Sequence, residues 1–161
     1  MDNNYNPINI VKTTHKMLRN IQFFWSLFIG IGAYGGAFMM IAYPSGIFEM
    51  GEMLPDIQKL PFAEILFQDL LFPGIALLVI NGVTNTISAI FIFRGNKYAA
   101  FSGMMCGIIL MLWILVQFYI FPFNFMSTLY FVFGFLQAVN GLMYLKKQKR
   151  DERTVDKNAR T

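Results

Sequence analysis

Charged residues are grouped along this chain, and long apolar stretches separate the groups. Three stretches of 29, 24 and 48 residues contain no Asp, Glu, Lys or Arg, and they cover residues 20–48, 70–93 and 98–145. A helix that crosses a bilayer needs about 20 mainly apolar residues. The first two stretches therefore each accommodate one membrane span, and the third accommodates two. We predict spans near residues 21–43, 72–93, 98–120 and 125–145.

The longest stretch contains a place where the chain can turn. Pro122 and Asn124 flank Phe123, and they join a helix-breaking residue to a turn-forming one. The pattern thus predicts an all-α integral membrane protein, an up-and-down bundle of four helices. Residues 1–20 form a basic segment before the bundle (21–145), residues 44–71 form a loop, and residues 146–161 form a basic tail.

Composition agrees with this class of protein. Hydrophobic residues make up 56% of the 161-residue chain and charged residues 14%, whereas soluble domains carry about 25% charged residues. Four long apolar runs cannot be hidden in the core of so short a soluble chain. The first run is also longer than the apolar region of a cleavable signal peptide, roughly 7–15 residues, so we expect an uncleaved span.

The distribution of charge predicts the orientation. Basic residues gather in the N-terminal segment, in the link between spans two and three, and at the start of the tail: Lys12, Lys16, Arg19, Arg94, Lys97, Lys146, Lys147, Lys149 and Arg150. The loop 44–71 holds five acids and one Lys. Because basic segments beside spans stay in the cytoplasm, we expect a plasma-membrane protein with both termini cytoplasmic and an outer acidic loop.

The outer loop is itself rich in apolar residues. Ile47, Phe48, Met50, Met53, Leu54, Ile57 and Leu60 recur at near-helical spacing among the acids, and a second apolar set follows Pro61. We therefore expect short amphipathic helices that lie on the membrane or cap the bundle. The acids Glu49, Glu52, Asp56, Glu64 and Asp69 suggest a cation site, but solvated topology determinants explain them as well. No metal site is predicted.

Several polar residues lie within the predicted spans. Asn81, Asn85 and Ser88 share one face of span two at i, i+4 and i+7, with Thr84 beside it. The other candidates for binding a ligand or lining a pore are Trp113, Gln117, Gln137 and Asn140. An unpaired amide in hydrocarbon costs several kcal/mol, so these groups should face inward. Interhelical hydrogen bonding and a polar path or pocket both remain open.

Glycines recur at helical spacing on three spans. The helix-packing candidates are Gly32, Gly36, Gly103, Gly107, Gly134 and Gly141. Small residues let membrane helices approach closely, either within one subunit or at a dimer face.

The residues needed for several kinds of chemistry are missing from the spans. His15 is the only histidine and lies outside them, so neither a catalytic Ser/His/Asp set nor bis-histidine haem ligation can be assembled there. The predicted spans contain no ionisable Asp, Glu, Lys or Arg, which proton-coupled transporters generally need. We predict no catalytic residue and no cofactor. The basic tail is better explained by anionic lipid than by nucleic acid.

Part of the chain has familiar sequence features. They are Leu71-Phe72-Pro73-Gly74, the turn at Arg94, Leu112-Trp113-Ile114-Leu115-Val116-Gln117 and the span from Gly134 to Gln137. Over residues 71–145 the chain resembles small bacterial four-span membrane proteins of uncharacterised function. The resemblance implies a bacterial plasma membrane and no particular activity.

Three functions remain compatible with the sequence. The leading hypothesis is a non-enzymatic accessory, scaffold or lipid/partner-binding subunit, whose partners are the lipid bilayer, another membrane protein or a second copy. The alternatives are a homo-oligomeric passive channel or small-molecule carrier with a polar path on span two, and a membrane enzyme acting on a lipid or quinone.

Overall fold

The computed structural model describes residues 7–45, 50–120 and 125–159, and every regular element in these ranges is helical. Within them, four segments are long and apolar enough to cross a membrane: Thr14–Ala42, Leu71–Phe93, Ala99–Ile120 and Phe125–Asp151. The chain is therefore all-α, with four candidate membrane spans. Glu49 and the predicted turn at Pro122 to Asn124 lie outside the described residues.

Span one belongs to a single helix, α1 (Pro7–Ala42), which begins well before the apolar run. Proline suits the first turn of a helix because its missing N–H needs no partner there. The helix ends just before Tyr43-Pro44, where the second proline disfavours helical geometry in the residue before it. The basic N-terminal residues from Lys12 onward are therefore on the same helix as the span.

Span two is one continuous helical path with a change of pitch in its middle. It consists of α4 (Leu71–Leu77), the π-helical segment η2 (Leu78–Val83) and α5 (Thr84–Phe93). Pro73 lies in the first turn, where it costs no hydrogen bond. The sequence predicted an ordinary helix here and gave no sign of the π segment.

Spans three and four are α6 (Ala99–Ile120) and α7 (Phe125–Ala159). A tight turn precedes α6, in which Gly95 has a φ of +64° and the Tyr98 N–H donates to Asn96 Oδ1 at 2.9 Å. Glycine adopts this left-handed conformation without a Cβ penalty. Helix α7 continues through the basic residues into the tail.

The segment between spans one and two contains three short helical elements: η1 (Met50–Met53), α2 (Leu54–Ile57) and α3 (Ala63–Leu66). Ile57 of α2 is buried against Met40 and Leu70, which lie near the ends of spans one and two. This apolar cluster, which also includes Met53 of η1 and Leu54 of α2, anchors η1 and α2 to the spans, whereas α3 has no buried residue.

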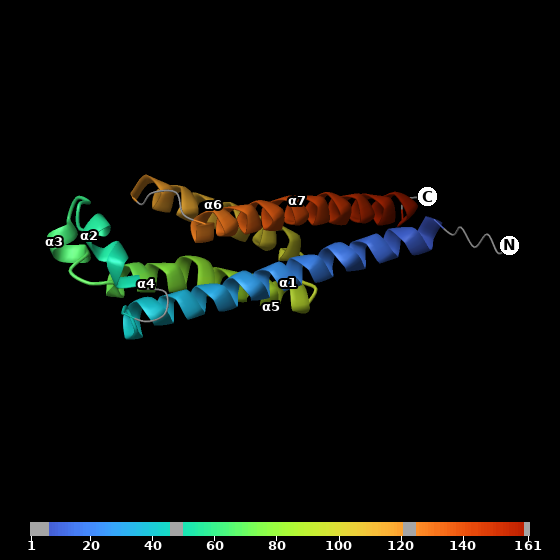
Figure 1. Cartoon of the computed structure of the whole chain (residues 1–161). Coiled ribbons are helices and arrows are strands. Elements are labelled where there is room, and N and C mark those ends of the chain that lie inside the picture. Colours follow the sequence, from blue (N-terminus) through green and yellow to red (C-terminus); the bar gives the residue numbers. More distant parts are fainter. Residues whose placement is uncertain (1–6, 46–49, 121–124, 160–161) are drawn as a thin grey trace.

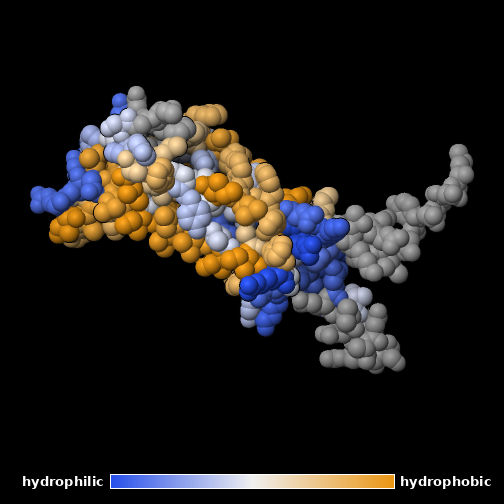
Figure 2. Space-filling model, turned by 90° about the horizontal axis from the view of Figure 1, so that it is seen from below, coloured by the Kyte–Doolittle hydropathy of each residue, from blue (hydrophilic) through white to orange (hydrophobic). Residues whose placement is uncertain are grey.

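Figure 1 shows the start of α1 and the end of α7 at one end of the molecule and α2 and α3 at the other. Helix α1 packs against α4, η2, α5 and α7, while α6 packs mainly against α7 and α5. Each span therefore has two main neighbours. On the face shown in Figure 2, apolar residues cover the middle of the molecule and hydrophilic residues gather at its two ends.

Among the described elements, helices α6 and α7 make the most extensive contact, and glycines line it. A Cβ added at Gly107 would lie 2.6 Å from Gly134 O, and one at Gly141 would lie 2.6 Å from Met104 Cα. Elsewhere, a Cβ at Gly32 would meet the Tyr130 hydroxyl at 2.7 Å, and one at Gly36 would meet Leu77 Cδ2 at 3.1 Å. These glycines make contacts within one subunit.

Alanine at Gly107 or Gly141 should destabilise the protein by about 1–3 kcal/mol, because the added Cβ would meet rigid backbone of the opposite helix. Gly35→Ala is the matched control, since nothing lies within 4 Å of a Cβ there. It should be neutral or slightly stabilising through helix propensity. Unfolding of the purified protein in detergent measures both, and equal effects at Gly35 and Gly107 would contradict the assigned contact.

Candidate functional site: the polar core between the spans

Eight polar side chains, which we call the polar core, gather between the four spans. They are Gln22, Ser26, Asn81, Asn85, Ser88, Ser102, Gln137 and Asn140. Six of them are only 0–1% exposed, although Ser102 is half-buried and Asn140 is 8% exposed. Every span contributes at least one residue. The polar core is thus enclosed within a single chain.

Gln137 lies at the centre of the polar core. Its Nε2 donates to Asn85 Oδ1 at 2.8 Å and contacts Ser26 Oγ at 3.4 Å. These bonds join α7 to α5 and to α1. One amide therefore holds three spans in register.

A line of hydroxyl groups extends this centre to the remaining span. Ser26 Oγ donates to Ser88 Oγ at 3.3 Å, and Ser88 Oγ lies 3.2 Å from Ser102 Oγ on α6. The Ser102 hydroxyl donates to Ala99 O at 3.1 Å, so Ser88 is the donor in its bond with Ser102. The hydrogen bonds from Gln137 to Ala99 O therefore all run in one direction and end at a backbone carbonyl.

A second amide pair lies one helical turn away, toward the end of the molecule that holds the chain termini. Asn140 Nδ2 donates to Gln22 Oε1 at 2.6 Å and to Leu18 O at 3.1 Å. The Gln22 side chain lies directly against Gly103 of α6, where a Cβ would lie 2.6 Å from Gln22 Cγ. Glycine at position 103 therefore makes room for an amide of another helix.

The remaining polar residues of span two bond to the backbone of the π segment. Thr84, Asn85 and Thr86 donate to the carbonyls of the residues four positions earlier: Ile80 O, Asn81 O and Gly82 O. In a bilayer, carbonyls released by an irregular turn need such partners because no water reaches them. The run Thr84-Asn85-Thr86 thus supports the local backbone as well as contacts between spans.

Asn81 differs from its neighbours. It is 1% exposed, and its Nδ2 and Oδ1 have no hydrogen-bond partner among the described residues. Gln22 Nε2, Gln137 Oε1 and Trp113 Nε1 are also buried without a partner in that part of the chain. Burying such a group without a partner costs roughly 1–3 kcal/mol. The buried Asn81 side chain therefore lowers the free energy of unfolding, whereas the paired amides raise it.

The residues singled out from the sequence fall into two places. Asn81, Thr84, Asn85, Ser88, Gln137 and Asn140 lie in or beside the polar core, whereas Gln117 lies near the far end of α6 and accepts a hydrogen bond from Ser127 Oγ at 3.1 Å. Trp113 packs on the apolar cluster of Ile29, Leu110 and Ile114. Sequence reasoning missed Gln22, Ser26 and Ser102. Gln22 and Ser26 form an i, i+4 pair that could have marked the inward face of span one.

The described residues contain no group of three or more His, Cys, Asp or Glu arranged to hold a metal ion. The chemistry available in the polar core is neutral hydrogen bonding by amides and hydroxyls. Cys106 lies beside it, with Sγ 3.5 Å from Thr84 O.

Comparison of the chain with protein-family models, with curated proteins and with solved structures gives no match.

A double-mutant cycle tests the central hydrogen bond. Asn85→Leu and Gln137→Leu should each destabilise the protein by about 1–3 kcal/mol, because each leaves a buried partner unpaired. The double variant should lose less than the sum, with a coupling of roughly 0.6–2 kcal/mol. Unfolding in detergent measures all the variants.

Gln117→Leu is the control for this cycle, since Gln117 bonds to Ser127 and not to the polar core. Its effect should add to that of Asn85→Leu within about 0.5 kcal/mol. Additivity in the Asn85/Gln137 pair would show instead that this hydrogen bond contributes nothing to stability.

Proposed function

We propose that this chain is a non-enzymatic, multi-pass membrane protein that acts as an accessory or scaffold subunit and binds lipid or a partner membrane protein. The observation that carries the proposal is that the polar side chains of the spans face inward and bond across helices. Hydrogen bonds link Ser26 to Ser88, and Gln137 to Asn85 and Ser26, so these side chains hold the spans together.

The surface that remains for contact is apolar. Large hydrophobic side chains are exposed along each span, among them Ile31, Phe38, Ile75, Leu112 and Phe135. A monomeric soluble protein rarely exposes so much apolar surface. In a membrane, lipid or another apolar helix covers such side chains, which supports a role in binding rather than in chemistry.

The topology that accompanies this function is an up-and-down bundle in a bacterial plasma membrane. Both termini then lie in the cytoplasm, and the loop 44–71 with its short helices faces outward. The start of α1 and the end of α7 lie at the same end of the molecule, which supports this arrangement (Figure 1). The basic residues near those ends support the cytoplasmic side.

Cysteine labelling tests the orientation. Ser45→Cys, in the loop, should react with a membrane-impermeant maleimide on intact cells, whereas Thr154→Cys, on the exposed end of α7, should react only after permeabilisation. The unmodified chain is the control, because its single cysteine, Cys106, is buried. The reverse labelling pattern would overturn the proposed topology.

Native mass spectrometry of the protein extracted gently from its own membrane tests the function. We expect a fixed complex with a second membrane protein, or a stoichiometric retained lipid. A monomer that retains neither would contradict the accessory role. A discrete homo-oligomer would favour the second candidate below.

The second candidate is a homo-oligomeric passive channel or carrier. The unpaired polar atoms of Asn81, Gln22 and Gln137 favour it, since a polar solute could bond to them. Liposome flux should then be lost in the Asn81→Leu/Asn85→Leu variant and kept in Val83→Leu, an exposed residue on the same span. The accessory function instead predicts that liposomes containing the unmodified chain carry no flux.

A further inference from the structure

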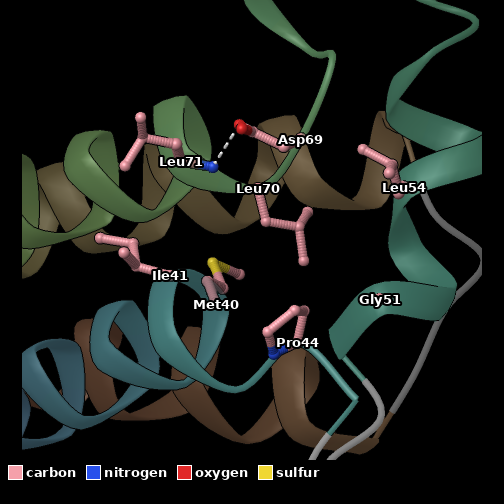
Figure 3. Close-up of a pocket in the computed structure, with 8 residues that line it drawn as sticks. All are labelled: Met40, Ile41, Pro44, Gly51, Leu54, Asp69, Leu70 and Leu71. Atoms are coloured by element: carbon pink, nitrogen blue, oxygen red, sulfur yellow. Dashed lines mark hydrogen bonds between the residues drawn. The ribbon is translucent and has the colours of Figure 1, made fainter.

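A small pocket lies where the loop segment meets the ends of spans one and two. Its volume is about 220 Å³, and its lining includes Met40, Ile41, Leu54, Asp69, Leu70 and Leu71. Figure 3 shows these side chains around the pocket, with Asp69 beside the first turn of α4. The pocket is separate from the polar core.

The pocket joins the buried interior to the apolar outer surface. Met40 and Leu70 belong to the cluster that anchors α2, and they are 7% and 4% exposed. Ile41 and Leu71, by contrast, are 42% and 48% exposed. These two residues belong to spans whose apolar side chains face outward. An apolar group dissolved in the membrane can therefore reach the pocket without crossing water.

Among the described residues that line the pocket, Asp69 is the one that carries a charge. Its Oδ1 accepts the Leu71 N–H at 2.8 Å, which fixes the carboxylate beside the pocket (Figure 3). The lysine of the loop, Lys59, pairs with Asp56. Among the described residues no Lys or Arg forms an ion pair with Asp69. The pocket thus presents a negative charge that this part of the chain leaves unbalanced.

We propose that this pocket binds the apolar end of an amphiphile that carries an ammonium head group, with the head group beside Asp69. The volume is smaller than the roughly 300–1,000 Å³ of sites that enclose a drug-sized ligand. The pocket therefore takes a chain end or a small ring, while the remainder of the ligand lies along the apolar surface. This ligand class rests on the proposed function, because it specifies what an accessory subunit of this kind would bind.

Three probes with the same alkyl chain separate charge from hydrophobicity: octylammonium, octanol and octanoate. Each is titrated into the full chain in nanodiscs of zwitterionic lipid, and the methyl NMR signals of Met40, Ile41, Leu54 and Leu70 report binding. We expect octylammonium to bind most tightly and octanoate most weakly. Equal affinity for all three probes would overturn the proposed role of the carboxylate.

Asp69→Asn removes the charge and keeps an oxygen that can accept the Leu71 N–H. It should weaken octylammonium binding roughly two- to five-fold, the range of an exposed ion pair, and leave octanol binding unchanged. Glu64→Gln is the matched control, because it changes the net charge equally at an exposed position outside the pocket. Equal losses in the two variants would show a general effect of loop charge and would refute the site.

Leu71→Trp tests the pocket itself by adding bulk at an exposed lining position. It should reduce binding of all three probes. Undiminished binding would place the probes elsewhere and overturn the proposal. This proposal and the proposed function can fail separately. If the probes bind in a charge-dependent way but native mass spectrometry finds no retained lipid or partner, the accessory role is contradicted and the proposed ligand class remains supported.

Discussion

Amide side chains inside hydrocarbon must find partners within the protein, and the arrangement of the spans depends on how they do so. Gln137 bonds to Asn85 and Ser26 on two other spans. Rotating α7 about its axis would break both bonds at once. The hydrophobic effect gives membrane helices no comparable preference, since lipid tails are as apolar as leucine. Specific orientation therefore comes from polar contacts and close packing.

Close packing and polar bonding are linked in this fold because hydrogen bonds between spans require short distances between helices. Gln22 lies against Gly103, and a Cβ at Gly30 would lie 3.4 Å from Asn85 Cβ. One turn further along α6 from Gly103, Gly107 lies against Gly134 and brings α6 and α7 together. Some glycines thus admit a neighbouring backbone, and others admit an amide side chain. A GxxxG spacing alone does not distinguish the two uses.

The four spans could be predicted from the sequence because the thickness of a bilayer sets the length of a span. A stretch of that length without charged residues therefore marks a span directly. Span two runs from Leu71 to Phe93 and span three begins at Ala99, each within a residue of the expected limits. Spans one and four extend to Thr14 and Asp151, six or seven residues beyond the expected limits, because their helices continue through the polar and basic residues beside the apolar runs. Partners in the polar core were harder to predict. Whether Gln22 or Ser102 faces another span depends on how each helix is rotated about its axis and on which helices are its neighbours. Both are properties of the tertiary structure. Gln22 also lies close to the basic segment, where a polar residue is unremarkable.

The π segment shows why polar residues in a span are poor evidence for a pore when taken from sequence alone. Three consecutive side chains after it, Thr84, Asn85 and Thr86, bond to its carbonyls. Such bonds remove the penalty of irregular backbone in a medium without water. Asn85 also bonds to Gln137, so one residue serves the local backbone and the tertiary contact. Asn81, one turn earlier, has neither kind of bond through its side chain. Within the polar core it is therefore the amide whose burial the hydrogen bonds of the fold explain least.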